Sequence, residues 1–224
     1  MEEARRTFIP AAGHDWGLPF YDPLVKVIGG DRARRALLEH LALRPGQAVL
    51  DVGCGTGSLA TLIKGLHPAV QVTGVDPDPK ALARARCKAM RAAVSIQLDQ
   101  GFADALPHPD ASFDRVLSSF VFHHLRWHEK AGMLTEARRV LKPGGLFCLL
   151  DFGGPESGID GSVARWLHSR RLLLDNDEGR ILTLMREAGL QDPKRIFRGA
   201  MVLGLAAYSC FQAAAPAAEV GHAC

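Results

Sequence analysis

Nine residues, Val49–Gly57, constrain the fold more than any other part of the chain. They form a short apolar run, then an acid, then three glycines at alternate positions, and read Val-Leu-Asp-Val-Gly-Cys-Gly-Thr-Gly. Such an apolar run is typical of a buried parallel strand, and the glycines allow a sharp turn and close approach of the backbone to a ligand. A helix starting near Ser58 would aim its backbone N–H groups at that ligand. The segment therefore predicts an α/β protein that binds an adenosine-bearing ligand.

Strands and helices are predicted to alternate through the middle of the chain. This alternation favours right-handed crossovers and a mostly parallel sheet with helices on both faces. The predicted strands are Ala48–Val52, Gln71–Val75 (ending in Asp76), Val94–Leu98, Phe113–Ser119 and Leu146–Asp151, and the predicted helices are Ser58–Leu66, Pro79–Met90 and Trp127–Val140.

The flanking segments are predicted to complete a single domain. Residues 1–45 are expected to be a helical lead-in in which Asp31 is an N-cap, followed by the cofactor-binding core at 46–152. Residues 153–190 are expected to be an insertion over the carboxyl edge of the sheet, with helices at Ser162–Leu174 and Arg180–Ala188. A closing antiparallel hairpin at 191–212, with strands Arg195–Phe197 and Val202–Cys210, and a tail at 213–224 complete the expected order.

Composition and charge favour an ordinary globular protein over one that binds nucleic acid, spans a membrane or holds structural zinc. The 224 residues are 47% hydrophobic and 23% charged with a formal charge of +3, values of an ordinary soluble protein. Because the basic residues are scattered, no nucleic-acid partner is expected, and Arg32, Arg34 and Arg35 are interpreted as a solvated helix face. No apolar stretch suits stable membrane insertion. Five cysteines without CxxC spacing favour a reduced, cytoplasmic protein without structural zinc. The sequence leaves a homodimer open.

The residues around the glycines distinguish between nucleotide ligands. Asp76 lies 23 residues after Gly53, near the distance expected of an acid that binds ribose hydroxyls. A dinucleotide fingerprint has a third glycine where this chain has Ser58. The carboxylate of Asp51 would repel a pyrophosphate but would suit a ligand that carries an ammonium group. An NAD(P)-dependent oxidoreductase is therefore disfavoured.

Five segments together carry a resemblance to a known family: Val49–Gly57, Asp76, Gly101–Pro107, Phe113–Leu125 and Leu141–Gly145. The chain resembles the class I S-adenosylmethionine-dependent methyltransferases, in the subgroup that includes the ubiquinone and menaquinone C-methyltransferases and many small-molecule methyltransferases. The resemblance covers about residues 45–152. It implies a Rossmann-like, mostly parallel seven-stranded sheet with helices on both faces, an antiparallel closing hairpin, and S-adenosyl-L-methionine as cofactor.

The resemblance also implies roles for individual residues. Asp51 would hold the amino group of the cofactor through water, and Asp76 would accept both ribose hydroxyls. The remaining contacts would come from the glycine-rich loop, from the two segments beside the adenine, from the end of the fourth strand and from the lead-in. These residues are Gly53, Cys54 and Gly55; Pro77 and Ala103; Ser118 and Ser119; and Tyr21.

The chain departs from the subgroup at one position in this set. The subgroup has Gly-Asp-Ala where this chain has Gly101-Phe102-Ala103. The usual carboxylate accepts a hydrogen bond from the adenine amino group, whereas Phe102 can only stack or pack there, unless Asp104 substitutes. Loss of one hydrogen bond weakens binding by about 1 kcal/mol, so cofactor use is retained.

Candidate bases lie at the predicted strand ends. Methyl transfer from a sulfonium needs an aligned nucleophile and removal of a proton from an O–H, N–H or acidic C–H acceptor. His123 and His124 follow the fourth strand and Asp151 ends the fifth. The alternative is that a histidine caps or packs under the next helix, and the sequence does not decide which one faces the ligand. His128 and Glu129 add no zinc-like spacing, so no metal is expected.

The resulting hypothesis is a methyltransferase that acts on a small, apolar or amphipathic acceptor. A protein or nucleic-acid acceptor is an alternative, disfavoured because Ser118–Val121 lacks the motif of the base-amino methyltransferases. A non-catalytic S-adenosylmethionine-binding protein is the other alternative, for which Phe102 is the support.

Overall fold

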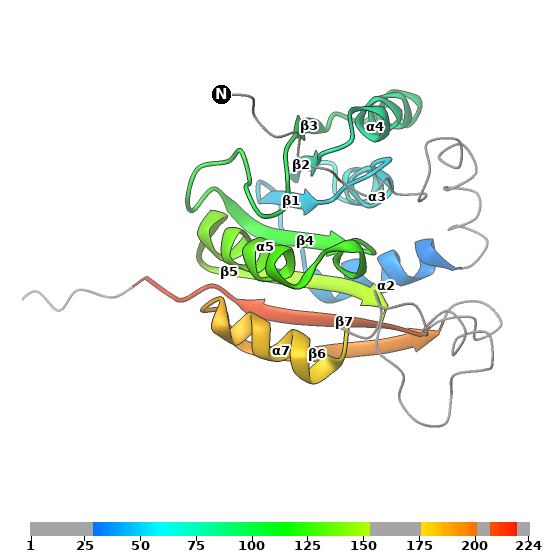
Figure 1. Cartoon of the computed structure of the whole chain (residues 1–224). Helices are drawn as coiled ribbons and strands as arrows, with labels where there is room; N and C mark the ends of the chain where they lie inside the picture. The colour runs from blue at the N-terminus through cyan, green and yellow to red at the C-terminus, as the bar shows by residue number, and fades with distance from the viewer. Residues whose placement is uncertain (1–28, 153–175, 201–206, 219–224) are drawn as a thin grey trace, which may run out of the picture.

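The computed structural model describes residues 29–152, 176–200 and 207–218. Seven strands form one sheet in the order β3-β2-β1-β4-β5-β7-β6 (Figure 1). Neighbours among β1 to β5 pair in parallel, and β7 is antiparallel to both β5 and β6. The predicted fold class is confirmed. The strands are β1 (Ala48–Val52), β2 (Gln71–Asp76), β3 (Gln97–Gln100), β4 (Phe113–Ser119), β5 (Leu141–Phe152), β6 (Gln191–Ala200) and β7 (Ala207–Ala214).

Helices cover both faces of the sheet. The face that carries α5 (Trp127–Val140) and α7 (Glu178–Glu187) is turned to the viewer in Figure 1, and α2 (Gly30–Leu41), α3 (Ser58–Leu66) and α4 (Pro79–Arg91) lie on the other. Alternate strand residues supply the two cores: Leu50 packs on the α5 side and Val49 on the α2 side. Both faces of the parallel strands are therefore buried, as their apolar runs predict.

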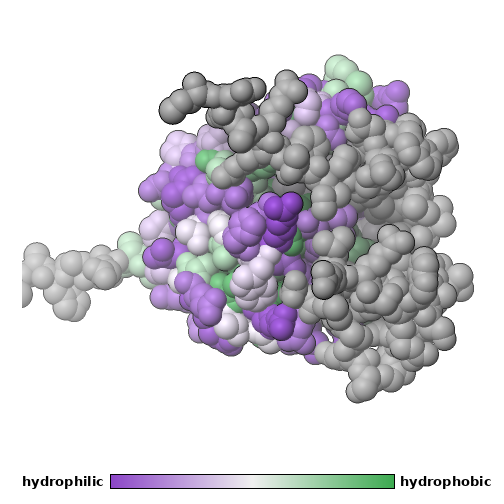
Figure 2. Space-filling view, in the orientation of Figure 1, coloured by the Kyte–Doolittle hydropathy of each residue, from purple (hydrophilic) through white to green (hydrophobic). Residues whose placement is uncertain are grey.

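The outer surface of α5 and α7 is mostly hydrophilic in the space-filling view (Figure 2). The large hydrophobic side chains that stay exposed in the described residues are Leu66, Met90 and Trp127. Within the described ranges, no helix has the length and apolar character needed to cross a bilayer.

The parallel strands bring distant acids to one edge of the sheet. Asp51 pairs in register with Gly74 of β2 and Leu117 of β4, and Ser119 pairs with Leu150 of β5. The carboxyl ends of β1, β2, β4 and β5 therefore meet, and Asp76 and Asp151 lie at two of those ends. This is the edge at which open α/β sheets bind ligands.

Four predicted strands have clearly different bounds in the structure. The strand expected at Arg195–Phe197 is β6, which is longer at both ends because its pairing with β7 runs from Gln191 to Ala200. The third strand was expected at Val94–Leu98, but its pairing with β2 begins at Gln97. Backbone pairing fixes the start of an edge strand, whereas the prediction relied on the apolar residues Val94 and Ile96. β5 starts at Leu141 instead of Leu146 because Leu141 pairs with Phe113. β7 continues to Ala214, past the expected end at Cys210, since Gln212 and Ala214 pair with β5.

Two further expectations are wrong in detail. Asp31 is not the N-cap of α2: that position is Gly29, in a left-handed conformation, and Asp31 lies in the first helical turn. The helix expected at Arg180–Ala188 begins at Glu178, because the side chain of Asp177 caps it by accepting from the Arg180 amide. The predicted helix Ser162–Leu174 and the start of the predicted strand at Val202 lie outside the described residues.

Candidate functional site

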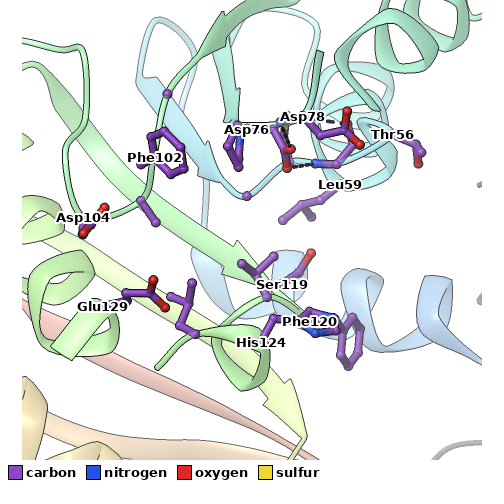
Figure 3. Close-up of a pocket in the computed structure, with 18 of the residues that line it drawn as sticks. Thr56, Leu59, Asp76, Asp78, Phe102, Asp104, Ser119, Phe120, His124 and Glu129 are labelled. Atoms are coloured by element: carbon purple, nitrogen blue, oxygen red, sulfur yellow. Dashed lines mark hydrogen bonds between the residues drawn. The ribbon is translucent and has the colours of Figure 1, made fainter. Parts of the chain in front are cut away.

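A cavity of about 360 Å³ lies at the carboxyl edge of the sheet. Asp76 and Asp78 lie on one side of it, and Ser119, Phe120 and His124 lie on the other (Figure 3). Of the residues predicted from the sequence to bind or react, ten line this cavity: Gly53, Cys54, Gly55, Asp76, Pro77, Phe102, Ala103, Asp104, Ser119 and His124.

The three glycines of the loop serve different purposes. All three adopt positive φ, at 70° for Gly53, 52° for Gly55 and 75° for Gly57. A Cβ on Gly53 would lie 2.6 Å from the side chain of Val121, and one on Gly57 would lie 2.8 Å from the Cβ of Ala85. A Cβ on Gly55 would meet nothing within 4 Å. Gly53 and Gly57 thus allow the loop to pack, while Gly55 leaves its backbone open to the cavity.

Asp76 holds the loop and still faces the cavity. Its Oδ2 accepts a hydrogen bond from the Gly55 amide at 2.8 Å, and its Oδ1 accepts one from the Asp78 amide at 2.9 Å (Figure 3). Burial raises the pKa of Asp76 above its ordinary value, although both amides oppose this. A carboxylate oxygen has two acceptor sites, so Asp76 can also accept hydrogen bonds from a ligand diol.

Residues 101–110 are bound along one side of α5. The Cα–H face of Gly132 leaves room for Asp104, since a Cβ there would come within 2.8 Å of the Asp104 Cβ. One turn on, Glu136 Oε2 accepts from the Leu106 amide at 2.8 Å. In the next turn Arg139 donates to the carbonyl of His108 at 2.8 Å and to Asp110 at 2.7 Å. The contacts with α5 therefore hold the segment that contains Phe102, Ala103 and Asp104 in place.

Asp51 is buried beneath the loop rather than in the cavity wall. It is 1% exposed, and neither carboxylate oxygen has a well-formed hydrogen bond within the described residues. Burial raises its pKa to about 7, with opposing effects from the Arg34 guanidinium and the Ala60 amide. A carboxylate kept in this condition has unused capacity to accept a hydrogen bond or to balance a cation.

The pKa of Asp51 predicts how cofactor binding depends on pH. An ammonium group favours the ionised carboxylate, so affinity for S-adenosylhomocysteine should rise between about pH 6 and pH 8, by at most about tenfold per unit. Asp51→Asn should bind more weakly at pH 8 and show a flatter profile. Calorimetric titrations of both proteins across this range measure the effect, and parallel profiles would contradict it.

The same substitution should stabilise the unliganded protein. Between pH 3.8 and about 7 the unfolded chain ionises Asp51 while the folded chain keeps it protonated, so stability falls with rising pH by about 1.4 kcal/mol per unit. Above about pH 7 the penalty is constant. Asp51→Asn should therefore raise the melting temperature more at pH 8 than at pH 4.

Two adjacent histidines adopt different environments. His123 is hydrogen-bonded through Nδ1 to Asp151 Oδ1 at 2.7 Å, and Asp151 is fully buried. Although burial acts to raise it, the pKa of Asp151 lies below its ordinary value, because His123 and the Phe152 amide stabilise the carboxylate. His124 lines the cavity, and burial lowers its pKa to about 4, helped by the neighbouring His123. The two rings are in contact, with centroids 4.0 Å apart and planes tilted by 41°.

Four other predicted site residues are not among those that line the cavity: Asp51, Ser118, His123 and Asp151. Of these, Asp51, Ser118 and Asp151 are buried. The predicted residue Tyr21 lies outside the described residues. Within the described ranges no group of three His, Cys, Asp or Glu side chains gathers to hold a metal ion.

Sequence reasoning missed one functional candidate. Arg34 was expected on a solvated helix face, yet it is 5% exposed and lines the cavity. Its exposed neighbours Arg32 and Arg35 fit that expectation. Spacing could have separated them, since Arg34 shares its face of α2 with the buried residues Leu37, Leu38 and Leu41.

The buried polar groups of this edge fit S-adenosylmethionine. Asp76 and the open Gly55 backbone suit a ribose, Phe102 and Pro77 offer flat surfaces for an adenine, and Asp51 suits an ammonium. The sheet is Rossmann-like, with a glycine-rich loop after its first strand and Asp76 at the end of its second. These features define an α/β protein of the class that binds S-adenosylmethionine or a similar adenosine ligand.

Comparisons with known proteins also indicate a methyltransferase. Residues 49–145 match the family model described as "Methyltransferase domain". The chain is 43% identical over 151 residues to the demethylmenaquinone methyltransferase of Deinococcus radiodurans, covering 66% of this chain and 61% of that protein. It is 38% identical over 157 residues to the demethylmenaquinone methyltransferase of Thermus thermophilus, covering 69% of this chain and 70% of that protein.

A solved structure extends the agreement in fold. Haemonchus contortus phosphoethanolamine N-methyltransferase 2, in complex with S-adenosyl-L-methionine, superposes with a TM-score of 0.73 at 18% identity. The match covers 92% of this chain and 58% of that one. On the family model and the Thermus thermophilus relative, the chain belongs to the class I S-adenosylmethionine-dependent methyltransferase family.

Proposed function

We propose that this protein transfers a methyl group from S-adenosylmethionine to a ring carbon of a small, quinone-type acceptor. The observation that supports it most is that the His123–Asp151 pair lies at the same edge of the sheet as the cavity, beside His124, which lines it. The names of the relatives, demethylmenaquinone methyltransferases, support the acceptor class.

The chemistry follows from what such an acceptor requires. Bound S-adenosylmethionine supplies an electrophilic methyl group. A quinone ring carbon is nucleophilic only when the ring is reduced to the hydroquinone, and the hydroquinone becomes a stronger nucleophile as its hydroxyl loses a proton. The S–CH₃ bond breaks as the new C–C bond forms, and the ring C–H proton is lost afterwards. The protein must therefore accept a proton close to the acceptor.

His123 is the proposed base. Its Nδ1 donates to the buried carboxylate of Asp151, which leaves Nε2 as the accepting atom and stabilises the imidazolium after proton transfer. Asp151 acts through His123 and is a positioning residue. His124, whose low pKa keeps it neutral at physiological pH, contributes the cavity wall and a hydrogen-bonding ring.

The experiment is a methyl-transfer assay with labelled S-adenosylmethionine. Dithionite-reduced demethylmenaquinone with a short prenyl tail is compared with the oxidised quinone and with protein and nucleic-acid acceptors. Transfer of label to carbon, only in the reduced sample, is the expected result, read by mass spectrometry of the product.

Each alternative has its own result in that assay. Label found in protein or nucleic acid would replace the small-molecule acceptor with a macromolecule. Cofactor binding by calorimetry without transfer to any acceptor would favour a non-catalytic binding protein. The first result, or label on oxygen instead of carbon, would overturn the proposed reaction.

A further inference from the structure

Lys130 of α5 and Asn176 form a buried polar pair that the reaction proposed above does not use. Lys130 is 1% exposed and Asn176 is fully buried, and the Nζ of the lysine donates a hydrogen bond to the Oδ1 of the asparagine at 2.7 Å. Lysine is almost never buried to this extent unless it is paired. Apolar side chains of similar size often stabilise a core as well as buried polar partners do. The pair therefore calls for an explanation beyond stability.

Asn176 joins this polar pair to the end of β5. Its Nδ2 donates a hydrogen bond to the carbonyl of Phe152 at 3.2 Å, while its Oδ1 accepts the one from Lys130. Asn176 directly precedes the N-cap of α7, so one side-chain amide links α5, β5 and the start of α7. Because both ends of the amide are engaged, Asn176 fixes the position of the Phe152 carbonyl relative to α5.

Phe152 in turn contacts both members of the His123–Asp151 pair. Its backbone amide donates to Asp151 Oδ1 at 2.6 Å, and its ring lies against the His123 ring, with centroids 4.9 Å apart and planes at 70°. The backbone amide of His123 also donates to Asp151 Oδ2 at 3.2 Å. The position of the Phe152 backbone therefore sets the direction of the Asp151 carboxylate and the orientation of the His123 ring.

Lys130 makes a second connection to the same site, through Phe122. Its Nζ lies 5.1 Å from the centroid of the Phe122 ring, within the range of a cation–π contact. Phe122 is fully buried and directly precedes His123 in the short 3₁₀ helix η2 (Phe122–His124). The polar pair thus contacts the residue next to His123 in the chain and the residue next to Asp151.

We propose that Lys130 and Asn176 are positioning residues, which hold the imidazole of His123 at the angle and distance that proton transfer requires. The proposal rests on His123 being the base of the function proposed above. A misplacement of about 1 Å at a reacting group lowers a rate by roughly 100-fold. Loss of the pair should therefore be visible in the rate, although neither residue is among those that line the cavity.

The main variant replaces both partners with apolar side chains of similar size, Lys130→Met together with Asn176→Leu. Its single-turnover rate of methyl transfer should fall by about 10- to 100-fold, while its affinity for S-adenosylhomocysteine stays within about threefold of the wild type. Because both polar groups are removed together, its melting temperature should change little. Lys64→Met is the matched control: Lys64 donates to the carbonyls of Pro68 and Val70 beyond the C-terminal end of α3, and its loss should leave the rate unchanged.

A double-mutant cycle tests whether the effect passes through His123. In a His123→Asn background the main variant's two substitutions should lower the rate no further, because the group that they position is absent. An equal loss in that background would overturn the proposal, as would an unchanged rate in the main variant. If the main variant does not fold, Asn176→Asp decides. Its carboxylate still accepts from Lys130 but cannot donate to Phe152, so the rate should fall, and an unchanged rate overturns the proposal.

A measurement without any acceptor separates this proposal from the proposed function. In the proton NMR spectrum of the wild type, the Nδ1 proton of His123 should give a signal far downfield, because it is hydrogen-bonded to a buried carboxylate. His123→Asn identifies this signal by removing it. The signal should shift or broaden in the main variant and stay unchanged in Lys64→Met. An unchanged signal in the main variant would overturn the positioning role. If the signal changes as expected but the wild type transfers no methyl group, the proposed function is overturned and the positioning role stands.

Discussion

His123→Asn is expected to lower the methyl-transfer rate by about 10²- to 10⁴-fold, the usual contribution of a general base. Asparagine can still donate to Asp151 through Nδ2, which lies near the position of Nδ1 in histidine, so the buried carboxylate keeps its partner. The substitution removes the proton-accepting nitrogen and little else. Single-turnover rates with reduced acceptor, together with S-adenosylhomocysteine affinity, measure the effect.

Matched variants make this result interpretable. His128→Asn changes an exposed histidine of α5 and should leave the rate unchanged. Asp151→Asn should lower the rate and move the acid limb of the pH–rate profile to lower pH, because a neutral amide no longer stabilises the protonated imidazole. A purely structural role for Asp151 would reduce the rate without moving that limb. A full rate in His123→Asn would exclude this residue as the base.

Asp76→Ala is expected to reduce affinity for S-adenosylhomocysteine by about 100-fold or more. Hydrogen bonds to a charged group are worth about 1.5–3 kcal/mol each, and the ribose offers two hydroxyls. The substitution also frees the amides of Gly55 and Asp78, which Asp76 holds at 2.8 and 2.9 Å. Loss of loop order should therefore add to the loss of direct contact.

A second ligand separates these two contributions. The 2′,3′-dideoxy analogue of S-adenosylhomocysteine lacks the ribose hydroxyls, so its affinity should fall in Asp76→Ala only by the share due to loop order. Asp76→Asn keeps an acceptor for the Gly55 amide and should weaken the natural ligand less than alanine does. Equal loss for both ligands would show that Asp76 acts on the loop alone.

The part of the cavity wall formed by the glycine-rich loop and Asp76 could be predicted from the sequence, because its determinants are local. The run Val49–Gly57 contains a strand, a turn and a helix start in nine consecutive residues, and its bounds in β1 and α3 match the structure. Asp76 follows from its distance along the chain to the loop. Such short-range sequence patterns predict local structure independently of the segments that pack against them.

The remainder depends on contacts between distant segments. Arg34 is buried because α2 turns its face to the cavity, and the residue type alone predicts exposure. The different surroundings of His123 and His124 depend on the 28-residue separation between His123 and Asp151. β7 ends at Ala214 because Ala214 pairs with Leu146 of β5. The alanine-rich sequence around Ala214 does not predict this pairing.

The lateral attachment of residues 101–110 to α5 has a consequence for how such a protein can diversify. Asp104, Leu106 and Asp110 are matched to successive turns at Gly132, Glu136 and Arg139. Inserting or deleting a residue in either partner would put every later attachment out of step. The contacts thus fix the spacing between residues 101–104 and the first turn of α5, where Glu129 lines the cavity. We therefore expect relatives that take other acceptors to differ mainly outside these two segments.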